Sequence, residues 1–267
     1  MKKVLIIGKR GFLGNSLSKN LKKSYYVRHI SFKQLNKIKT KLDRFNYIVN
    51  TSTNKSYIFK RYNERFDNDL KIAKLINNNK TIYIFLSTRK VYKCNINLNE
   101  KSKLSPKSNY SKNKLISEKK LNKILGKKLL ILRISNIIGD RKLTKKIHHT
   151  FIDVFFENIK KGFVFDNGDD FKDFLSIDKF CQIFRGILKK DLVGVYNVSI
   201  GQKVYLNNII EWLNRYNKNK LKKIKIIKKN NDSFFLNNKK LMSKNKIKNS
   251  LTELKNYCHK LSKQKFF

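Results

Sequence analysis

The feature that most constrains this chain is a short apolar run followed directly by three evenly spaced glycines. Residues 4–7 (V-L-I-I) have the length and composition of a buried strand, and Gly8, Gly11 and Gly14 follow them. One glycine permits the tight turn, a second lets the backbone approach a phosphate, and a third allows close packing of a helix on a strand. A helix over 14–22 would point its free N–H groups at the same phosphate. The segment therefore predicts a strand–turn–helix unit that holds the pyrophosphate of a dinucleotide.

The rest of the first half alternates strand-like runs with helix-like stretches. Such alternation is typical of βαβ units and of a parallel sheet. We expect strands at 4–7, 26–30, 47–50, 82–87 and 129–134, and helices at 14–22, 66–77 and 111–125. The segment 31–46 has room for a helix but for little more, so we expect a reduced element there.

The pattern changes after about Gly139. Helix-like stretches (147–161, 178–189, 206–216) then alternate with short strand-like pieces (162–165, 194–198, 224–228), without a Gly/Ser-rich linker. The expected fold class is α/β: a Rossmann-like, doubly wound parallel sheet with a smaller C-terminal α+β substrate lobe. Residues 1–140 would form the dinucleotide-binding domain. Residues 141–267 would form mainly the substrate-binding lobe, interleaved with the first domain.

The charge of the chain is the second unusual feature. Its 267 residues include 63 Lys and Arg against 18 Asp and Glu, a formal net charge of +45. A strongly basic domain is a candidate for binding nucleic acid. However, the cations are 53 Lys against 10 Arg, spread along the whole chain. Because nucleic-acid binders usually add clustered Arg and exposed aromatic residues, we interpret the charge as a solvated Lys-rich surface and expect no nucleic-acid partner.

We expect neither a membrane segment nor a metal site. No apolar run approaches the roughly 20 residues of a membrane-spanning helix, and the apolar run 4–7 is too short for a signal peptide. We therefore expect a cytoplasmic protein with reduced thiols. The remaining metal candidates lack partners at ligand spacing, so we expect surface or packing roles for His29, His148, His149, Cys94, Cys181, Cys258 and His259.

The end of the second strand bears on the choice of dinucleotide. Proteins that bind NAD usually place Asp or Glu there, where it bonds the ribose hydroxyls. Residues 27–32 contain no acid but include Arg28 and Ser31, and Arg10 lies within the glycine turn. Two guanidinium groups near the adenosine 2′ position favour a 2′-phosphate. We therefore expect NADP as the cofactor, with NAD as the alternative.

A Tyr–Lys pair stands at the start of the helix expected at 111–125. Tyr110 and Lys114 are four residues apart, which puts both side chains on one helix face. A neighbouring ammonium favours the phenolate, so such a pair can act as general acid or base on an alcohol or carbonyl. Ser87 and Thr88 end the strand before it, where hydroxyl groups point into the cofactor crevice of a parallel sheet. Thr88 can thus hold the substrate oxygen beside the tyrosine.

Together these features resemble the extended short-chain dehydrogenase/reductase family, of the NAD-dependent epimerase/dehydratase or nucleotide-sugar reductase/epimerase type. The resemblance covers nearly the whole chain. Residues 106–118 match the family pattern P-x-S-x-Y-x-x-x-K-x-x-x-E, and the only proline of the chain falls at the matching position. Further similar segments are the glycine turn, the strand end 50–53, Asn68, the segment S-T-R-K-V-Y at 87–92, L-R-I-S-N-I-I-G at 132–139, D-F-L-S-I-D at 173–178 and the strand 194–198.

The resemblance implies roles for individual residues. Thr88, Tyr110 and Lys114 would be catalytic, and Thr88 and Asn136 would contact the substrate. The cofactor-binding residues would be Gly8, Arg10, Gly11, Phe12, Leu13, Gly14, Arg28, Asn50, Thr51, Ser52, Ser87, Tyr110 and Lys114.

The implied activity is an NAD(P)-dependent oxidoreductase or epimerase that transfers hydride at a keto or hydroxyl carbon of a nucleotide-linked sugar. Dehydration is disfavoured, because Arg89 and Lys90 occupy the positions where dehydratases of the family carry an acidic pair. The family resemblance also leaves a homodimer open. The alternative is a non-catalytic dinucleotide-binding regulator, or an RNA-binding relative with the same fold, since a fold alone does not determine function.

Overall fold

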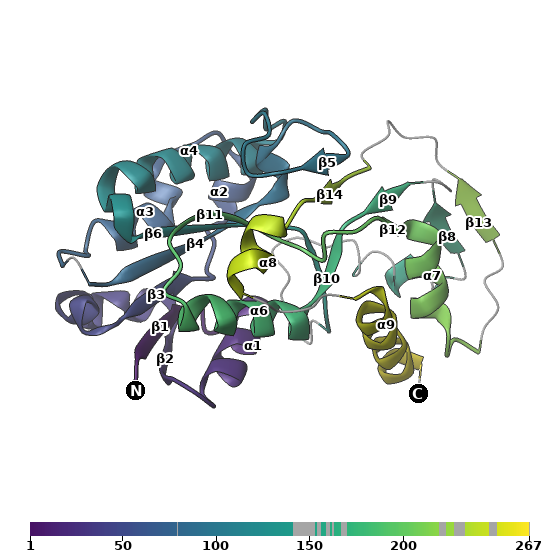
Figure 1. Cartoon of the computed structure of the whole chain (residues 1–267), viewed down its shortest axis with the longest axis horizontal. Coiled ribbons are helices and arrows are strands. Elements are labelled where there is room, and N and C mark those ends of the chain that lie inside the picture. Colours follow the sequence, from purple (N-terminus) through teal and green to yellow (C-terminus); the bar gives the residue numbers. More distant parts are fainter. Residues whose placement is uncertain are drawn as a thin grey trace.

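A six-stranded parallel sheet forms the centre of the protein, here described from a computed structural model (Figure 1). The structure describes residues 1–78, 80–140, 153, 156–158, 161, 163–166, 170–218, 223–226, 233–245 and 250–266. His148, His149 and most of the helix expected at 147–161 lie outside the described residues.

The strands of this sheet run in the order β11–β6–β4–β3–β1–β2. The first strand β1 therefore has β2 on one side and β3 on the other, which is the point where ligands bind in doubly wound sheets. The expected α/β fold class is confirmed. The strand bounds are β1 Lys3–Ile7, β2 Tyr26–Ile30, β3 Tyr47–Asn50, β4 Ile82–Thr88, β6 Leu129–Ile134 and β11 Gly194–Val198.

Helices cover both faces of the sheet, as Figure 1 shows. Alternate residues of a strand point to opposite faces. On one face, Val4 and Ile6 pack with α1 (Phe12–Leu21) and α6 (Ile177–Lys189). On the other, Leu5 and Ile7 pack with α3 (Asn68–Ala73) and α4 (Asn109–Leu125). A short helix α2 (Lys55–Phe59) lies against α4.

The segment between β2 and β3 contains two 3-10 helices in place of an α-helix. These are η1 (Phe32–Lys37) and η2 (Lys39–Arg44). Leu35, Ile38 and Leu42 nevertheless bury their side chains in the same core as Leu5 and Ile7. The reduced element thus still covers the sheet.

Short strand pairs and helices of the second half form a group beside the sheet (Figure 1). Trp212 lies in the core of this group, with residues of α7 and α9. Among the described residues, no helix is long and apolar enough to cross a membrane. The remaining elements are η3 Glu64–Phe66, η4 Arg89–Val91, β5 Asn97–Leu98, η5 Gly126–Lys128, β7 Asn136–Ile138, β8 Phe163–Asp166, β9 Phe171–Lys172, β10 Phe174–Ser176, β12 Val204–Tyr205, α7 Leu206–Asn214, β13 Lys223–Ile226, β14 Phe235–Leu236, α8 Lys239–Asn245 and α9 Leu251–Phe266.

A substitution at Phe180 can test the packing of α6 on the sheet. Its ring is fully buried in the same core as Val4 and Ile6. Replacing Phe180 by Ala should lower the free energy of unfolding by about 3–5 kcal/mol, because a cavity replaces the ring. Phe59→Ala, at a side chain 54% exposed, should change it by no more than about 0.5 kcal/mol. Denaturant titration of both variants measures this, and equal midpoints would contradict the packing.

Candidate active site

The glycine turn between β1 and α1 is closed by backbone hydrogen bonds. Gly8 has φ of +124°, which a residue with a side chain rarely adopts. Its N–H donates to the carbonyl of Ile30 at 2.8 Å, and the N–H of Gly11 donates to the carbonyl of Gly8 at 3.0 Å. Gly11 precedes the first turn of α1 and provides no side-chain cap. The first N–H groups of α1 therefore face the switch point of the sheet, as an anion site requires.

Thr51, directly after β3, fills the space beneath this turn. Its Oγ1 donates to the carbonyl of Ile7 at 2.9 Å. An added Cβ would lie 2.3 Å from that oxygen at Gly8 and 2.5 Å from it at Gly14. Both positions therefore require glycine. The turn thus has the close glycine packing that a dinucleotide pyrophosphate site requires.

The loop after β3 is internally bonded. The Oδ1 atom of Asn50 accepts from the N–H of Ser52 at 2.9 Å and from its hydroxyl at 2.6 Å. Asn68 donates to the same hydroxyl at 3.2 Å. The residues 50–52 assigned to the cofactor thus form a rigid edge beside the glycine turn.

The residues assigned to the adenosine end are mostly at the surface. Arg10 and Arg28 are both exposed. Ser31 donates its hydroxyl to Oε1 of Gln34 at 3.1 Å, as part of the cap of η1. Phe12 is half-buried: a Cβ on Gly139 would be 2.3 Å from its ring, so Phe12 packs against the residue that follows β7.

Tyr110 and Lys114 lie on one face of α4, at its N-terminal end. Lys114 is only 6% exposed and donates from Nζ to the carbonyl of Leu86 at 2.8 Å. The same Nζ lies 4.4 Å from the ring centroid of Phe85 and 6.0 Å from that of Tyr110. Lys114 is thereby held against β4 at Leu86, two residues before Thr88.

The two hydroxyls at the end of β4 have different surroundings. Thr88 is half-buried, and its Oγ1 accepts from the N–H of Lys90 at 3.3 Å. Ser87 is buried and donates to Oε1 of Glu118 at 2.5 Å. The hydroxyl of Ser87 therefore binds inside the fold rather than in the crevice.

Glu118 and Arg133 form a buried ion pair that the sequence reasoning did not assign. Nη2 of Arg133 lies 2.7 Å from Oε2 of Glu118, and each side chain is about as buried as a core residue. Glu118 favours the charged guanidinium and raises the pKa of Arg133. Sequence alone offered one signal, the match of both residues to family motifs at 106–118 and 132–139.

Two buried acids near Lys114 were also missed. Asp67 accepts from the hydroxyls of Ser117 at 2.5 Å and of Tyr62 at 3.0 Å. Asp69 accepts from the hydroxyl of Tyr83 at 2.7 Å. The only signal in the sequence is the acidic start of the helix expected at 66–77, which is equally typical of a solvated helix end.

Asn136, assigned to the substrate, lies in β7. Its side-chain amide donates to the carbonyl of Asp173 at 3.1 Å. Asp173 is fully buried and accepts from the N–H groups of Ile200, Gly201 and Leu236 at 3.0–3.2 Å. Burial raises the pKa of Asp173 to about 7. Asn136 is thus attached to the junction between the sheet and the second half of the chain.

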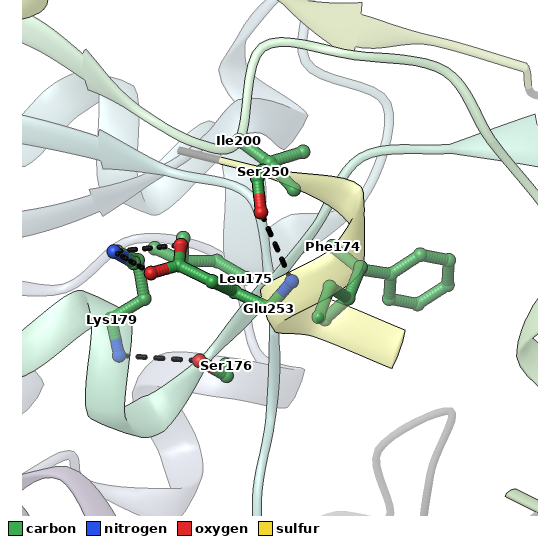
Figure 2. Close-up of a pocket in the computed structure, with 8 residues that line it drawn as sticks. Phe174, Leu175, Ser176, Lys179, Ile200, Ser250 and Glu253 are labelled. Carbon is green, nitrogen blue, oxygen red and sulfur yellow. Dashed lines mark hydrogen bonds and ion pairs between the residues drawn. The ribbon is translucent and has the colours of Figure 1, made fainter. Parts of the chain in front are cut away.

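A small cavity lies elsewhere, between β10, α6 and α9. Figure 2 shows the ion pair of Lys179 and Glu253 across it, with Nζ 2.8 Å from Oε2. This pair joins α6 to α9. Neither Tyr110 nor Lys114 lines this cavity. No group of three or more His, Cys, Asp or Glu in the described part of the chain is arranged to hold a metal ion.

Two glycine variants can distinguish the role of the turn in stability from its role in binding a phosphate. Gly14→Ala should cost roughly 1–3 kcal/mol of stability, because its methyl would overlap packed atoms. A Cβ on Gly11 would meet nothing closer than 3.4 Å, so Gly11→Ala should change stability by no more than about 1 kcal/mol. It should nevertheless weaken dinucleotide binding about tenfold, or ~1.4 kcal/mol. Thermal unfolding and cofactor fluorescence titration check the pair, and wild-type affinity in Gly11→Ala would contradict the phosphate cradle.

The fold resembles several solved structures. A UDP-N-acetylglucosamine 4-epimerase from Methanobrevibacter ruminantium has 21% identity and a TM-score of 0.79, over 98% of this chain and 97% of that one. A UDP-glucuronic acid 4-epimerase from Bacillus cereus has 16% identity and a TM-score of 0.77, over 99% and 100%. A dTDP-4-dehydrorhamnose reductase from Clostridium acetobutylicum has 18% identity and a TM-score of 0.75, over 97% and 99%. At these identities the likeness shows a shared fold.

Comparison with curated protein sequences finds no match. The sequence model of the NAD dependent epimerase/dehydratase family, however, matches residues 4–199. Since this match spans well over half of the chain, the protein belongs to the NAD-dependent epimerase/dehydratase family.

Proposed function

We propose that this protein is an NAD(P)-dependent reductase or epimerase of a nucleotide-linked sugar. The observation that carries the proposal is the placement of Tyr110 and Lys114 on one face of α4, with Lys114 bonded to Leu86 near the end of β4. That strand ends at the same edge of the sheet as the glycine turn. The proposed proton donor and the proposed dinucleotide cradle therefore lie at the same edge of the sheet.

Tyr110, Lys114 and Thr88 each have a separate role in the proposed proton transfer. A nicotinamide dinucleotide in the cradle supplies the hydride donor or acceptor. In the reducing direction Tyr110 gives a proton to the sugar oxygen, and in the oxidising direction it removes one. The ammonium of Lys114 lies 6.0 Å from the centroid of the Tyr110 ring, and we expect it to hold the cofactor beside the phenol. Thr88 hydrogen-bonds the same sugar oxygen and fixes its position.

The nucleotide sugar is proposed from the relatives and from the site. The Methanobrevibacter structure contains UDP-N-acetylmuramic acid, and the Bacillus and Clostridium proteins are named for nucleotide sugars. Thr88 and Asn136 would contact the sugar. Arg89 and Lys90 follow Thr88 and offer no carboxyl group to protonate a departing hydroxyl, so we favour reduction or epimerisation over dehydration.

Tyr110→Phe tests the catalytic role directly. The variant should still bind the dinucleotide, but turnover should fall by about two or more decades, because the proton donor is lost. Absorbance of reduced nicotinamide with a panel of nucleotide sugars measures turnover. The matched control is Tyr26→Phe, at a tyrosine 54% exposed at the start of β2, which should keep wild-type turnover. Undiminished activity in Tyr110→Phe would favour a non-catalytic dinucleotide-binding protein.

Arg10 and Arg28 predict a preference for NADP over NAD. Replacing either by Gln should weaken NADPH binding about tenfold, since a charged hydrogen bond contributes roughly 1.5–3 kcal/mol. NADH binding should not change. Arg44→Gln, at an exposed arginine of η2, is the control. Fluorescence titration with both dinucleotides decides the matter, and equal affinity of the wild type for NADH and NADPH would remove the preference.

A further inference from the structure

A half-buried histidine that the proposed reaction does not use lies beside the glycine turn. His29 is in β2, where it pairs with Ile6 of β1. A Cβ on Gly14 would lie 3.1 Å from Nε2 of His29 and 2.7 Å from the carbonyl oxygen of Gly8. The imidazole therefore flanks the same point as the start of α1 and the carbonyl that closes the turn.

The Nε2 atom of His29 is enclosed, and it has no hydrogen-bond partner among the described residues. In the imidazolium form both ring nitrogens carry a hydrogen, so Nε2 must then donate. A buried donor without an acceptor costs free energy, and the carbonyl of Gly8 is close by. That carbonyl already accepts from the N–H of Gly11 at 3.0 Å. A protonated His29 would thus compete with Gly11 for the bond that closes the turn.

The charged groups that act on His29 in the described part of the chain are positive. Burial lowers the pKa of His29, and Lys9 and Lys22 lower it further, whereas the carbonyl of Gly8 opposes the shift. Lys9 lies in the turn and Lys22 ends α1, while β1 presents the uncharged Ile6. The start of α1 adds the positive end of the helix dipole. The closed turn therefore disfavours the imidazolium.

We propose that His29 is a positioning residue of the dinucleotide site: its neutral imidazole leaves the Gly8 carbonyl bonded to Gly11, and its protonation disrupts that bond. The turn then loses its closed form, and dinucleotide binding weakens as the pH falls. The identity of the ligand rests on the proposed function, whereas the packing of His29 against the turn does not.

Proton release on binding sets the direction of this pH effect. If the closed turn requires neutral His29, a protonated protein must give up its proton before it binds. Each pH unit below the pKa of His29 then weakens binding by up to about tenfold. If the imidazolium instead fitted the closed turn, the ligand pyrophosphate would stabilise it and binding would tighten in acid. The two cases have opposite signs.

His29→Gln removes the titration and places a neutral amide at the same position. NAD⁺ and NADP⁺ are titrated calorimetrically into the wild type and the variant between about pH 8 and pH 5. Because the 2′-phosphate of NADP⁺ itself takes up a proton at about pH 6, the effect is measured as the ratio of the wild-type Kd to the variant Kd. This ratio should be close to one at the alkaline end and should rise in acid, by up to about tenfold per pH unit.

The matched control is His259→Gln. His259 lies in α9, and burial lowers its pKa as well, so this variant should keep the pH dependence of the wild type. A ratio of wild-type Kd to His29→Gln Kd that stays constant, or that falls toward acid pH, would overturn the proposal.

Imidazole NMR of the wild type gives a second measurement, which does not depend on the folding of a variant. By reciprocity, a ligand that requires neutral His29 lowers the pKa of this residue. His29 should therefore titrate at lower pH with the dinucleotide bound than without it, and an unchanged or raised pKa would overturn the proposal. A lowered pKa in a protein that turns over no nucleotide sugar would uphold the role of His29 and contradict the proposed function. A wild type that binds neither dinucleotide would contradict both.

Discussion

The buried ion pair of Glu118 and Arg133 fixes α4 relative to the sheet. Glu118 lies one helical turn beyond Lys114, and Ser87 donates to the same carboxylate. Loss of one partner from such a pair costs about 3–5 kcal/mol, because the other stays as an uncompensated charge. The face of α4 that carries Tyr110, Lys114 and Glu118 therefore has one setting against β4 and β6. The proposed proton donor takes its position from that setting.

The few acidic residues of this basic chain are not all at the surface. Of 18 Asp and Glu, several are buried and hydrogen-bonded at the carboxyl ends of the strands or at the junction with the second half. Because Arg89, Lys114, Arg133 and Lys179 are buried as well, burial removes acids and cations in similar number, and the surface keeps the large excess of cations that the net charge of +45 indicates. Such a surface attracts anionic ligands over long distances. The buried acids among the described residues are Asp67, Asp69, Glu118, Asp153, Asp170 and Asp173.

The parts of the fold that could be predicted from the sequence are those set by local chemistry. The glycine turn follows from spacing, and the strands of the main sheet follow from short apolar runs. The form of residues 31–46 could not be predicted. The apolar residues of this segment are spaced so that either two 3-10 helices or one α-helix could bury them against the sheet. Sequence also could not show that Ser87 bonds Glu118, 31 positions away, since that contact depends on how α4 packs.

The choice between reductase and epimerase can be argued from charge. An epimerase needs Tyr110 to take a proton and to give it back within one turnover, which favours a phenol balanced between its two forms. A reductase needs Tyr110 only to give a proton in each turnover, so the proposed pair would serve either reaction. The distinction therefore depends on the cofactor. The exposed Arg10 and Arg28 would favour a 2′-phosphorylated dinucleotide, which serves net reduction, and they are the argument for the reductase form of the proposed function.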